Sequence, residues 1–431
     1  MTDLSAQILP RIKAHKIDAL PLGDEMLFPY YEGLSLVNLP GTVTKLLDVP
    51  SFGKPALDDD ILEKLGGPYE KVILMLVDAL GYHLLSDMMD SDPSLVWSRL
   101  FDRALFSPIT SITPSTTASA LTTLWTGEGP GAHGIIGYEM WAKEFGMVIN
   151  NILHSAGSAW GDVGGLARSG FNAHDFLDMP LLGTHLKAHG VPSAAFLHRS
   201  IGHSGLSVMQ LEDVNLNLYV DEADLCVGLA DFVNSRAGIR EYIYVYYSHV
   251  DTLMHRYSAE DPRVTLQFTA FSNLFEKAFL EKLSNPIAAN TLLILTADHG
   301  SMTTPRDPRY DLKNHPELLD CLVMQPTCEN RLAFLYIKPG REDDVRGYFE
   351  RTWPAEFILM DSDTALDEGL FGGGPFKDQA RDRLGNLIAA AKGNAYLWWA
   401  KKPNPMAGRH GGLSTREMLV PFYALPLDQF K

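Results

Sequence analysis

Five short segments of this sequence carry carboxylates, imidazoles and hydroxyls that suit divalent metal ions. They are Val77-Asp78, Pro114-Ser115-Thr116-Thr117, Asp251 to His255, Asp298-His299-Gly300 and Arg409-His410-Gly411-Gly412. Taken alone, an aspartate at a strand end or a single histidine is more often a structural residue than a ligand. Together the segments offer three Asp, three His and a hydroxyl, which is enough for two metal ions that keep open positions. Open positions admit a substrate, so we expect a two-metal site for phosphoryl transfer.

The types of donor narrow the choice of metal. Carboxylate oxygens mixed with imidazole nitrogens suit zinc, manganese or iron, and we expect two divalent ions, Zn²⁺ ahead of Mn²⁺ or Fe. No cysteine accompanies these segments, which argues against a structural zinc site closed by thiolates. Cys226, Cys321 and Cys328 lack CxxC spacing, so we expect buried or idle thiols rather than a disulfide framework.

The composition is typical of a soluble globular enzyme, with 431 residues of which 46% are hydrophobic and 21% charged. The 53 acidic residues outnumber the 36 lysines and arginines, and the formal charge is -17. Such a charge repels duplex nucleic acid, whereas a small phosphate ester or nucleotide remains compatible where metals reverse the local field. The sequence has neither an apolar run of about 20 residues nor an apolar signal core near its start. We therefore expect a cytoplasmic protein without a membrane partner.

Three continuous apolar runs have the length of buried strands, namely residues 72–77, 242–247 and 292–295. They recur between longer amphipathic stretches, which predicts an α/β fold with a mostly parallel central sheet sandwiched by helices. Because ligands of open α/β sheets bind beyond the carboxyl ends of the strands, we expect Asp78, Asp251 and Asp298 to meet in space. The alternative for each aspartate is a helix N-cap.

By sequence, the chain divides into a core and two additions. The Pro-rich and less periodic residues 1–65 are expected to form an arm packed on the core. All the candidate ligands lie in residues 66–301 and 405–431, which we expect to form the catalytic core. Residues 302–404 lack candidate ligands and contain Gly and Pro clusters such as Phe371 to Pro375. This segment is predicted to be a cap or insertion that contributes in part to the core.

The segment from Thr113 to Gly127 is expected to supply the nucleophile. Pro114 is favoured just before or at the start of a helix, so residues 115–117 would lie at a helix N-terminus with free backbone N–H groups. A phosphate binds well at such an end, and metal coordination activates a threonine hydroxyl. The alternative is a plain run of capping Ser and Thr residues.

Read in order, these segments resemble the alkaline phosphatase superfamily, specifically its nucleotide pyrophosphatase/phosphodiesterase branch. The matching parts are VDALG at Asp78, PSTTASALTTLWTG with GPGAHGI following, DTLMH, TADHG and GRHGG. They extend from about residue 70 to 415, which leaves the arm and most of the cap without support. The resemblance implies a phosphothreonine-type intermediate on an alkaline-phosphatase-like fold.

The resemblance also implies a role for each candidate residue. One metal would be held by Asp251, His255 and His410, and the other by the remaining set, Asp78, Asp298, His299 and the nucleophile. Counting back from the family's TG at residues 126–127 places the nucleophile at Thr117, with Thr116 as the alternative. His133 fits the family pattern too, and we interpret it as a supporting or structural residue.

The sequence departs from the family where a phosphoryl oxygen would be bound. The diesterase branch often has an Asn shortly after HGI, whereas this chain has Tyr138 there. The candidates for substrate binding are therefore Tyr138, Asn150, Asn151 and the backbone N–H groups of Thr117 and Ala118. For the two asparagines, a role within a loop is at least as plausible.

The segment 116–127 contains no arginine, a residue that would clamp the extra charge of a phosphate monoester. Its absence favours phosphodiesters or nucleotide pyrophosphates. The alternatives are a phosphomonoesterase, a metal-dependent phosphomutase or phosphotransferase, and a binding protein that retains the fold without activity. Trp125, Tyr138 and Trp141 are either stacking partners for a substrate ring or members of the core.

Overall fold

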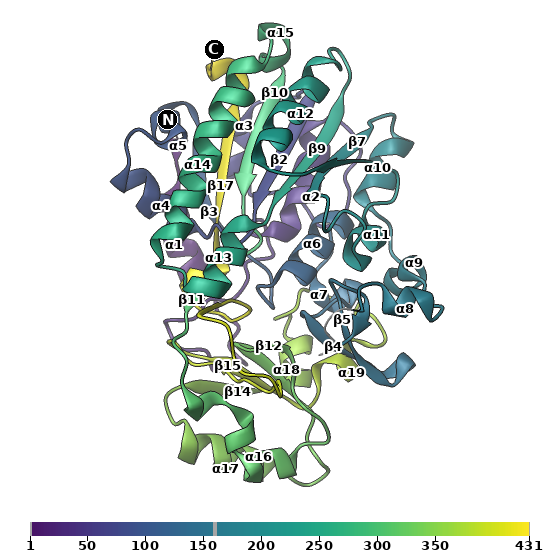
Figure 1. Cartoon of the computed structure of the whole chain (residues 1–431), viewed down its shortest axis with the longest axis vertical. Helices are drawn as coiled ribbons and strands as arrows, with labels where there is room; N and C mark the ends of the chain where they lie inside the picture. Colours follow the sequence, from purple (N-terminus) through teal and green to yellow (C-terminus); the bar gives the residue numbers. More distant parts are fainter. Residues whose placement is uncertain (1, 158–161, 431) are drawn as a thin grey trace.

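A computed structural model describes residues 2–157 and 162–430. In this part of the chain eight strands form the large sheet shown in the upper half of Figure 1. Their order across the sheet is β1 (Thr2–Asp3), β3 (Leu105–Thr110), β17 (Leu419–Pro426), β10 (Thr291–Thr296), β2 (Lys71–Val77), β9 (Glu241–Tyr247), β7 (Ser193–His198) and β8 (Val214–Tyr219). Strand β17 runs antiparallel to its neighbours β3 and β10, and the other pairings are parallel. The predicted α/β fold with a mostly parallel central sheet is confirmed.

The three predicted strands are β2, β9 and β10, side by side at the centre of the sheet. Every residue of these strands is buried, as expected for parallel strands covered on both faces. Their register aligns Lys71 with Glu241 and Thr291 at one end. Since they run in the same direction, their carboxyl ends reach the same edge of the sheet.

Helices pack against the large sheet on both faces (Figure 1). Those that precede or follow its strands are α1 (Ser5–Ala14), α2 (Leu39–Leu46), α3 (Asp59–Leu65), α4 (Tyr82–Ser91), α5 (Val96–Arg99), α6 (Thr117–Thr126), α7 (Pro130–His133), α8 (Gly165–Arg168), α9 (Ala173–Leu177), α10 (Leu182–Ala188), α11 (Gly205–Gln210), α12 (Glu222–Asn234), α13 (His249–Tyr257), α14 (Pro262–Ala278), α15 (Asn285–Ala288) and α20 (Thr415–Met418). The amphipathic α14 buries Val264, Phe268, Phe271 and Phe275, a spacing of three or four residues that places them on one face.

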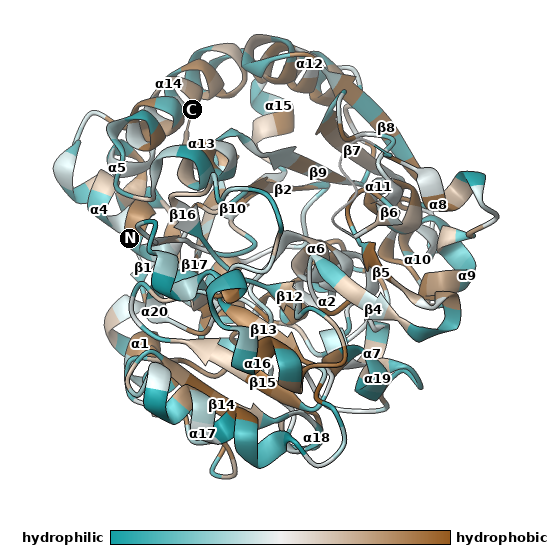
Figure 2. Cartoon of the chain, turned by 60° about the horizontal axis from the view of Figure 1, so that its bottom comes forward, coloured by the Kyte–Doolittle hydropathy of each residue, from teal (hydrophilic) through white to brown (hydrophobic). Residues whose placement is uncertain are grey.

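Seven further strands of the described residues form a smaller antiparallel sheet below the first (Figure 1). Their order is β14 (Phe357–Asp361), β15 (Leu387–Ala391), β13 (Leu332–Leu335), β12 (Thr327–Glu329), β4 (Glu139–Ala142), β5 (Met147–Asn150) and β6 (Ser155–Ala156). Four helices accompany it, namely α16 (Pro316–Cys321), α17 (Glu342–Thr352), α18 (Ser362–Asp367) and α19 (Ala380–Leu384). In Figure 2, its strands β14 and β15 are mostly brown while α17 carries much teal. The buried residues of α17 are Val345 and Phe349, so its polar residues lie on the outside.

The division into arm, core and cap stays a prediction, and the structure adds two details to it. Strand β1 of the arm pairs with β3, so the arm extends the large sheet. The smaller sheet takes β12 to β15 from residues 302–404 but β4 to β6 from residues 139–156, joined where Cys328 pairs with Glu139. A two-stranded ribbon of β11 (Met302–Thr303) and β16 (Gly408–Arg409) leads the chain out of the core and back.

Cys226, Cys321 and Cys328 are all buried free thiols, which confirms the prediction for the cysteines. Among the helices of residues 2–157 and 162–430, none combines the length and apolarity needed to cross a membrane.

Candidate metal and phosphoryl-transfer site

The predicted ligands converge at the carboxyl edge of the large sheet, between the two sheets. Asp78 follows β2 directly, and Asp298 lies two residues beyond β10. Asp251 and His255 lie one turn apart on α13, the helix that follows β9, so both side chains lie on one face. His410 comes directly after β16, because the ribbon with β11 returns the chain to this edge.

One group consists of Asp78, Asp298 and His299, all fully buried. The Nε2 atom of His299 lies 3.5 Å from Asp78 Oδ1 and 3.4 Å from Asp298 Oδ2. Within this group, the imidazole and the two carboxylates therefore point at a common position.

The second group consists of Asp251, His255 and His410. His255 Nε2 lies 3.3 Å from Asp251 Oδ1 and 3.2 Å from His410 Nε2, while His410 Nε2 lies 3.9 Å from Asp251 Oδ1. The two groups adjoin each other, because the rings of His299 and His410 stack with centroids 3.7 Å apart. His299 also stands close enough to Asp251 and His410 to share an ion with them.

Each of the three histidines has its Nδ1 atom beside a backbone carbonyl. The acceptors are Gly408 O for His255 at 3.0 Å, Gly300 O for His299 at 2.9 Å and Ser115 O for His410 at 3.1 Å. A ring that donates its Nδ1–H in this way presents a lone pair on Nε2, which is the usual arrangement of a metal-binding histidine. Burial and the neighbouring rings of His299 and His255 lower the pKa of His410 well below its ordinary value, so its imidazole is neutral.

Three carboxylate oxygens in these groups lack a hydrogen-bond partner, namely Asp78 Oδ1, Asp251 Oδ1 and Asp298 Oδ2. An unpaired buried carboxylate is costly unless a cation compensates it. Burial, and then the charges of Asp298 and Asp251, raise the pKa of Asp78 well above its ordinary value. The residues present therefore fit divalent metal ions. None of the three aspartates caps a helix: Asp251 lies within α13, and the N-cap of α4 is Gly81.

The predicted nucleophile segment lies at the N-terminus of α6, with Thr116 as N-cap and Thr117 as first residue. None of its hydroxyls caps the helix. Ser115 donates to Gly412 O at 2.8 Å, Thr116 donates to the Glu329 carboxyl at 2.6 Å, and Thr117 Oγ1 lies 3.2 Å from His299 Nε2. Thr117 is therefore the hydroxyl that adjoins the ligand groups, and Thr116 faces the smaller sheet.

Two residues of this neighbourhood were missed by sequence reasoning. Tyr246, from β9, donates its hydroxyl to Asp78 Oδ2, which fixes that carboxylate with its other oxygen free. Glu329, at the end of β12, places its carboxyl against Thr116. Burial raises the pKa of Glu329 to about 8. In the run YIYVYY, no sequence pattern distinguishes the tyrosine that faces the site. Glu329 reaches the site because strands that are distant in sequence pair with each other.

The remaining predicted residues have the following contacts. Ala118 is buried in the first turn of α6, where its N–H precedes the first helical hydrogen bond, from Ala120 N to Thr116 O. The side-chain oxygen Oδ1 of Asn150 accepts from the backbone N–H groups of residues 152 and 153, and the side-chain amide of Asn151 donates to Gly137 O at 2.7 Å. Tyr138, the residue before β4, is 37% exposed.

His133 and Trp125 both lie in the interior. The Nε2 atom of His133 is 3.1 Å from Thr123 Oγ1, and its Nδ1 accepts from Ile135 N. Burial lowers the pKa of His133 to about 3, so the ring is neutral and has a structural role, as we interpreted it. Trp125 packs edge-on against Tyr242 and Tyr244, which places it in the core.

Residues 72–413 match the sequence model of the family described as Type I phosphodiesterase / nucleotide pyrophosphatase. No curated protein matches the chain in sequence. Murine ectonucleotide pyrophosphatase/phosphodiesterase 5, in an inactive form in complex with AMP, is similar in structure. The TM-score is 0.61 at 16% identity, with 82% of this chain and 87% of that chain covered.

Phosphonoacetate hydrolase from Sinorhizobium meliloti 1021, in complex with phosphonoformate, is also similar in structure. The TM-score is 0.57 at 16% identity, with 83% of this chain and 93% of that chain covered. At such identities the structural likeness shows the fold, whereas the family follows from the match over most of the chain.

Proposed function

Because the chain belongs to the type I phosphodiesterase/nucleotide pyrophosphatase family of the alkaline phosphatase superfamily, we propose that it is a two-metal hydrolase of phosphodiester or nucleotide pyrophosphate bonds. The observation that carries this proposal is the hydroxyl of Thr117. It lies at a helix N-terminus, 3.2 Å from His299 and beside two groups of carboxylates and imidazoles. Thr117 is the proposed nucleophile, and the intermediate would be a phosphothreonine or its ester.

The proposed metal ligands are those that the family resemblance implied. Asp251, His255 and His410 would hold one ion, and Asp78, Asp298, His299 and Thr117 the other. We propose zinc, with manganese or iron as alternatives, because the donors mix carboxylate oxygen and imidazole nitrogen. When bound, such ions lower the pKa of a coordinated hydroxyl or water and offset negative charge on phosphoryl and leaving-group oxygens.

The residues of the chain then perform the following steps. The free N–H groups of Thr117 and Ala118 point out of the first turn of α6, where they can donate to phosphoryl oxygens. Thr117 Oγ1 gives up its proton to solvent and forms a bond to phosphorus, while the bond from phosphorus to the leaving oxygen breaks and that oxygen takes up a proton from solvent. Water then cleaves the bond between Oγ1 and phosphorus and restores the hydroxyl. Tyr246 keeps Asp78 oriented throughout.

Two features support a diester over a monoester. The helix α6 has no arginine that could pair with a second phosphoryl charge. In addition, the carboxyl of Glu329 contacts Thr116 next to the nucleophile, and above its pKa of about 8 the ionised carboxylate repels a dianion more than a monoanion. The two neighbours, described with AMP and with phosphonoformate, support a small substrate. Tyr138, Asn150 and Asn151 remain proposed substrate contacts.

The test is hydrolysis by metal-stripped enzyme refilled with zinc or manganese. Bis-p-nitrophenyl phosphate, p-nitrophenyl phosphate and the p-nitrophenyl ester of thymidine monophosphate are compared in parallel. We expect turnover that depends on the metal and a higher kcat/KM for the diesters. A preference for the monoester would make the enzyme a phosphatase. Transfer of the phosphoryl group to an added acceptor alcohol, instead of to water, would favour a phosphotransferase.

The cytoplasmic location expected from the sequence is likewise a proposal. It is tested by fractionation of the native host with an antibody against the chain.

A further inference from the structure

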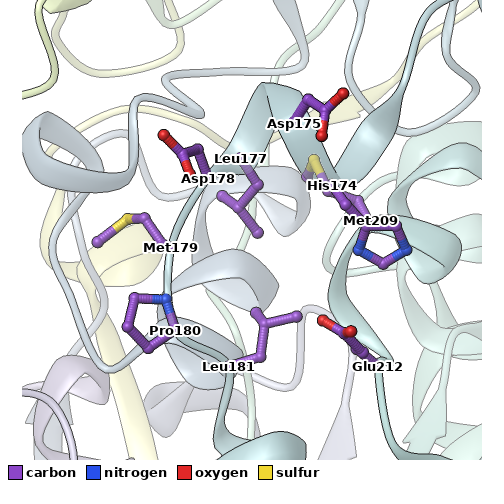
Figure 3. A pocket seen from close by; sticks show the side chains of 9 residues that line it. All are labelled: His174, Asp175, Leu177, Asp178, Met179, Pro180, Leu181, Met209 and Glu212. Carbon is purple, nitrogen blue, oxygen red and sulfur yellow. The ribbon is translucent and has the colours of Figure 1, made fainter.

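A hollow of about 300 Å³, shown in Figure 3, is lined by residues from α9 to just beyond α11. It contains neither the nucleophile nor a candidate ligand. Three of its lining residues are the acids Asp175, Asp178 and Glu212, whose carboxylates would repel a phosphate. The hollow therefore takes no part in the proposed reaction.

A buried arginine, Arg409, has a direct link to that reaction, because it precedes the proposed ligand His410. Arg409 is 1% exposed, and none of the ion pairs among the described residues includes it. Its guanidinium carbon lies 3.8 Å from the centre of the Tyr396 ring and 5.9 Å from that of Trp398. A buried charge is costly unless its neighbours compensate it, and the faces of aromatic rings do so in part. The rest of the compensation comes from hydrogen bonds to uncharged groups.

These hydrogen bonds join two segments of the chain. Nη1 of Arg409 donates to Thr304 Oγ1 at 2.6 Å, and Nη2 donates to Asn404 Oδ1 at 2.6 Å. Thr304 follows β11, where the chain leaves the core, and Asn404 precedes β16, where the chain returns. The guanidinium therefore fixes the two ends of this excursion to each other.

The same guanidinium reaches the smaller sheet. Its Nε lies 3.4 Å from the acceptor Oδ1 of Asn330, between β12 and β13. Tyr396, whose ring lies against it, follows β15, and the Tyr396 hydroxyl accepts from Asn404 Nδ2 at 3.1 Å. Arg409 thus connects the ribbon of β11 and β16 with two loops of the smaller sheet.

The ribbon also contacts both histidines of the second ligand group. Gly408 O lies 3.0 Å from His255 Nδ1, and Ala407 N donates to His255 O at 2.8 Å. His410 follows Arg409 directly. A shift of residues 407–409 would therefore move one histidine and the carbonyl that orients the other.

The first ligand group depends much less on this ribbon. Asp78 follows β2, and Asp298 lies two residues beyond β10; both strands lie in the centre of the large sheet. His299 has its Nδ1 beside Gly300 O. Loss of the contacts of Arg409 should therefore affect the second ligand group more than the first.

We infer that Arg409 is a positioning residue for the ion that Asp251, His255 and His410 would hold, and that through it the smaller sheet sets the affinity for this ion. This inference rests on the proposed two-metal function. Residues that orient metal ligands typically change metal affinity roughly 10- to 100-fold when they are replaced. The two proposed ions should therefore respond differently to a change at position 409.

The first experiment titrates metal-free protein with zinc in competition with a chromophoric chelator. The wild type should bind two ions. In Arg409→Met, one ion should bind roughly 10- to 100-fold more weakly, while the other binds as in the wild type. The melting temperature of the metal-free protein should change little, because an apolar side chain can replace a buried charge without a net loss. Binding of both ions with wild-type affinity would overturn the inference.

Arg409→Lys separates the geometry of the guanidinium from its charge. An ammonium keeps the charge but cannot present a planar fork to both Thr304 and Asn404. The weakened zinc step should therefore persist in this variant. Wild-type affinity in Arg409→Lys would contradict a positioning role, because charge alone would then account for the effect.

Two further variants complete the comparison. Arg306→Met is the matched control, because Arg306 is exposed and donates to Pro405 O at 3.0 Å on the same returning segment. It should leave both zinc steps unchanged, and a loss equal to that of Arg409→Met would show that Arg409 has no specific role. Asn404→Ala removes an acceptor of Arg409 and should weaken the same zinc step. It tests the inference even if Arg409→Met does not fold.

Rescue by excess zinc distinguishes positioning from a general structural role. All the proposed ligands remain in Arg409→Met, so saturating zinc should return its kcat for bis-p-nitrophenyl phosphate to near the wild-type value. At limiting zinc the variant should be less active than the wild type. A kcat that stays low at saturating zinc would count against positioning of the ion.

The wild-type titration separates this inference from the proposed function. If the wild type binds fewer than two ions, the two-metal function fails and the inference fails with it. If the wild type binds two ions and hydrolyses the diester while Arg409→Met binds both ions equally well, only the inference fails.

Discussion

At the residue scale, the site is defined by which side-chain atoms of its histidines and aspartates already have a hydrogen-bond partner within the protein. His255, His299 and His410 each have Nδ1 beside a backbone carbonyl, and Tyr246 donates to one oxygen of Asp78. The atoms left over are the Nε2 nitrogens and unpaired carboxylate oxygens. Because backbone and phenol contacts fix the side chains, their free atoms point inward before any ion binds.

The nucleophile can be tested by comparing two adjacent threonines. Thr117→Ala should reduce kcat by roughly 10³-fold or more and leave the metal content largely unchanged, because six other ligands remain. Thr116→Ala removes a hydrogen bond to Glu329 and should reduce kcat by about tenfold at most. Steady-state kinetics and metal analysis of both variants measure this. The reverse order of effects would assign the nucleophile to Thr116.

The charge of Glu329 should influence the choice between ester types. Glu329→Gln keeps an oxygen that can accept from Thr116 but removes the ionisable carboxyl. At pH 9, above its pKa of about 8, the wild-type carboxylate opposes a dianionic monoester. We expect the variant to raise the monoester-to-diester ratio of kcat/KM by roughly 3- to 10-fold.

The pH dependence of this ratio provides a control for the comparison of the wild type with Glu329→Gln. Below pH 7 the wild-type carboxyl of Glu329 is mostly protonated, because its pKa is raised to about 8, and the two enzymes should then show similar ratios. The difference between the two enzymes in the monoester-to-diester ratio of kcat/KM should grow as the pH rises through 8. A ratio that is the same in both enzymes at pH 9 would show that Glu329 does not select the substrate.

At the element scale, the site depends on how the two sheets are joined. The large sheet places Asp78 and Asp298 at the ends of β2 and β10, and the smaller sheet contributes Glu329 through β12. A buried ion pair ties the two together. Arg331 donates from Nε and Nη2 to Glu417 at 2.7 and 2.9 Å, and both side chains are fully buried. Glu417 also accepts from Gly412 N, so the pair holds the loop after His410.

Breaking this pair should loosen that loop. Arg331→Met leaves the Glu417 carboxylate buried without its partner, which should cost about 3–5 kcal/mol of unfolding free energy. Denaturant unfolding measures the loss. The double variant Arg331→Met with Glu417→Gln removes the unpaired charge and should recover part of it. No recovery would mean that the ion pair is not coupled as the structure indicates.

The central strands could be predicted from sequence because their apolar runs are continuous, and the convergence of Asp78, Asp251 and Asp298 followed from the direction of parallel strands. Two features of the site could not be predicted from the sequence. In YIYVYY, both faces of β9 are buried, so no periodicity marks Tyr246 as the residue that reaches Asp78. Glu329 reaches Thr116 because β12 pairs with β4 across almost 190 residues, and no local pattern records such a pairing.

At the scale of the whole molecule, the acidic residues outnumber the basic ones, and the site proposed to bind an anion contains carboxylates of its own. The chain has a formal charge of -17, and three of its carboxylates lie together in the site, each with an oxygen that lacks a hydrogen-bond partner. Without cations this arrangement repels a phosphate. Metal binding therefore has two effects that should be separable, since it relieves repulsion in the folded protein and creates the positive field that attracts the substrate.

Removal of the metals should destabilise the whole protein. A ligand that binds the folded state at 100 times its Kd adds about 2.7 kcal/mol of stability, so zinc should raise the melting temperature of the stripped enzyme by a few degrees. Asp298→Asn keeps the oxygen that accepts from Ala79 N and His299 N while removing one charge beside Asp78. In the stripped state this variant should melt above the wild type, and zinc should shift it far less. If the stripped variant melts lower and responds to zinc as the wild type does, Asp298 is a structural acceptor rather than a ligand, and the group with Asp78 and His299 would not hold an ion.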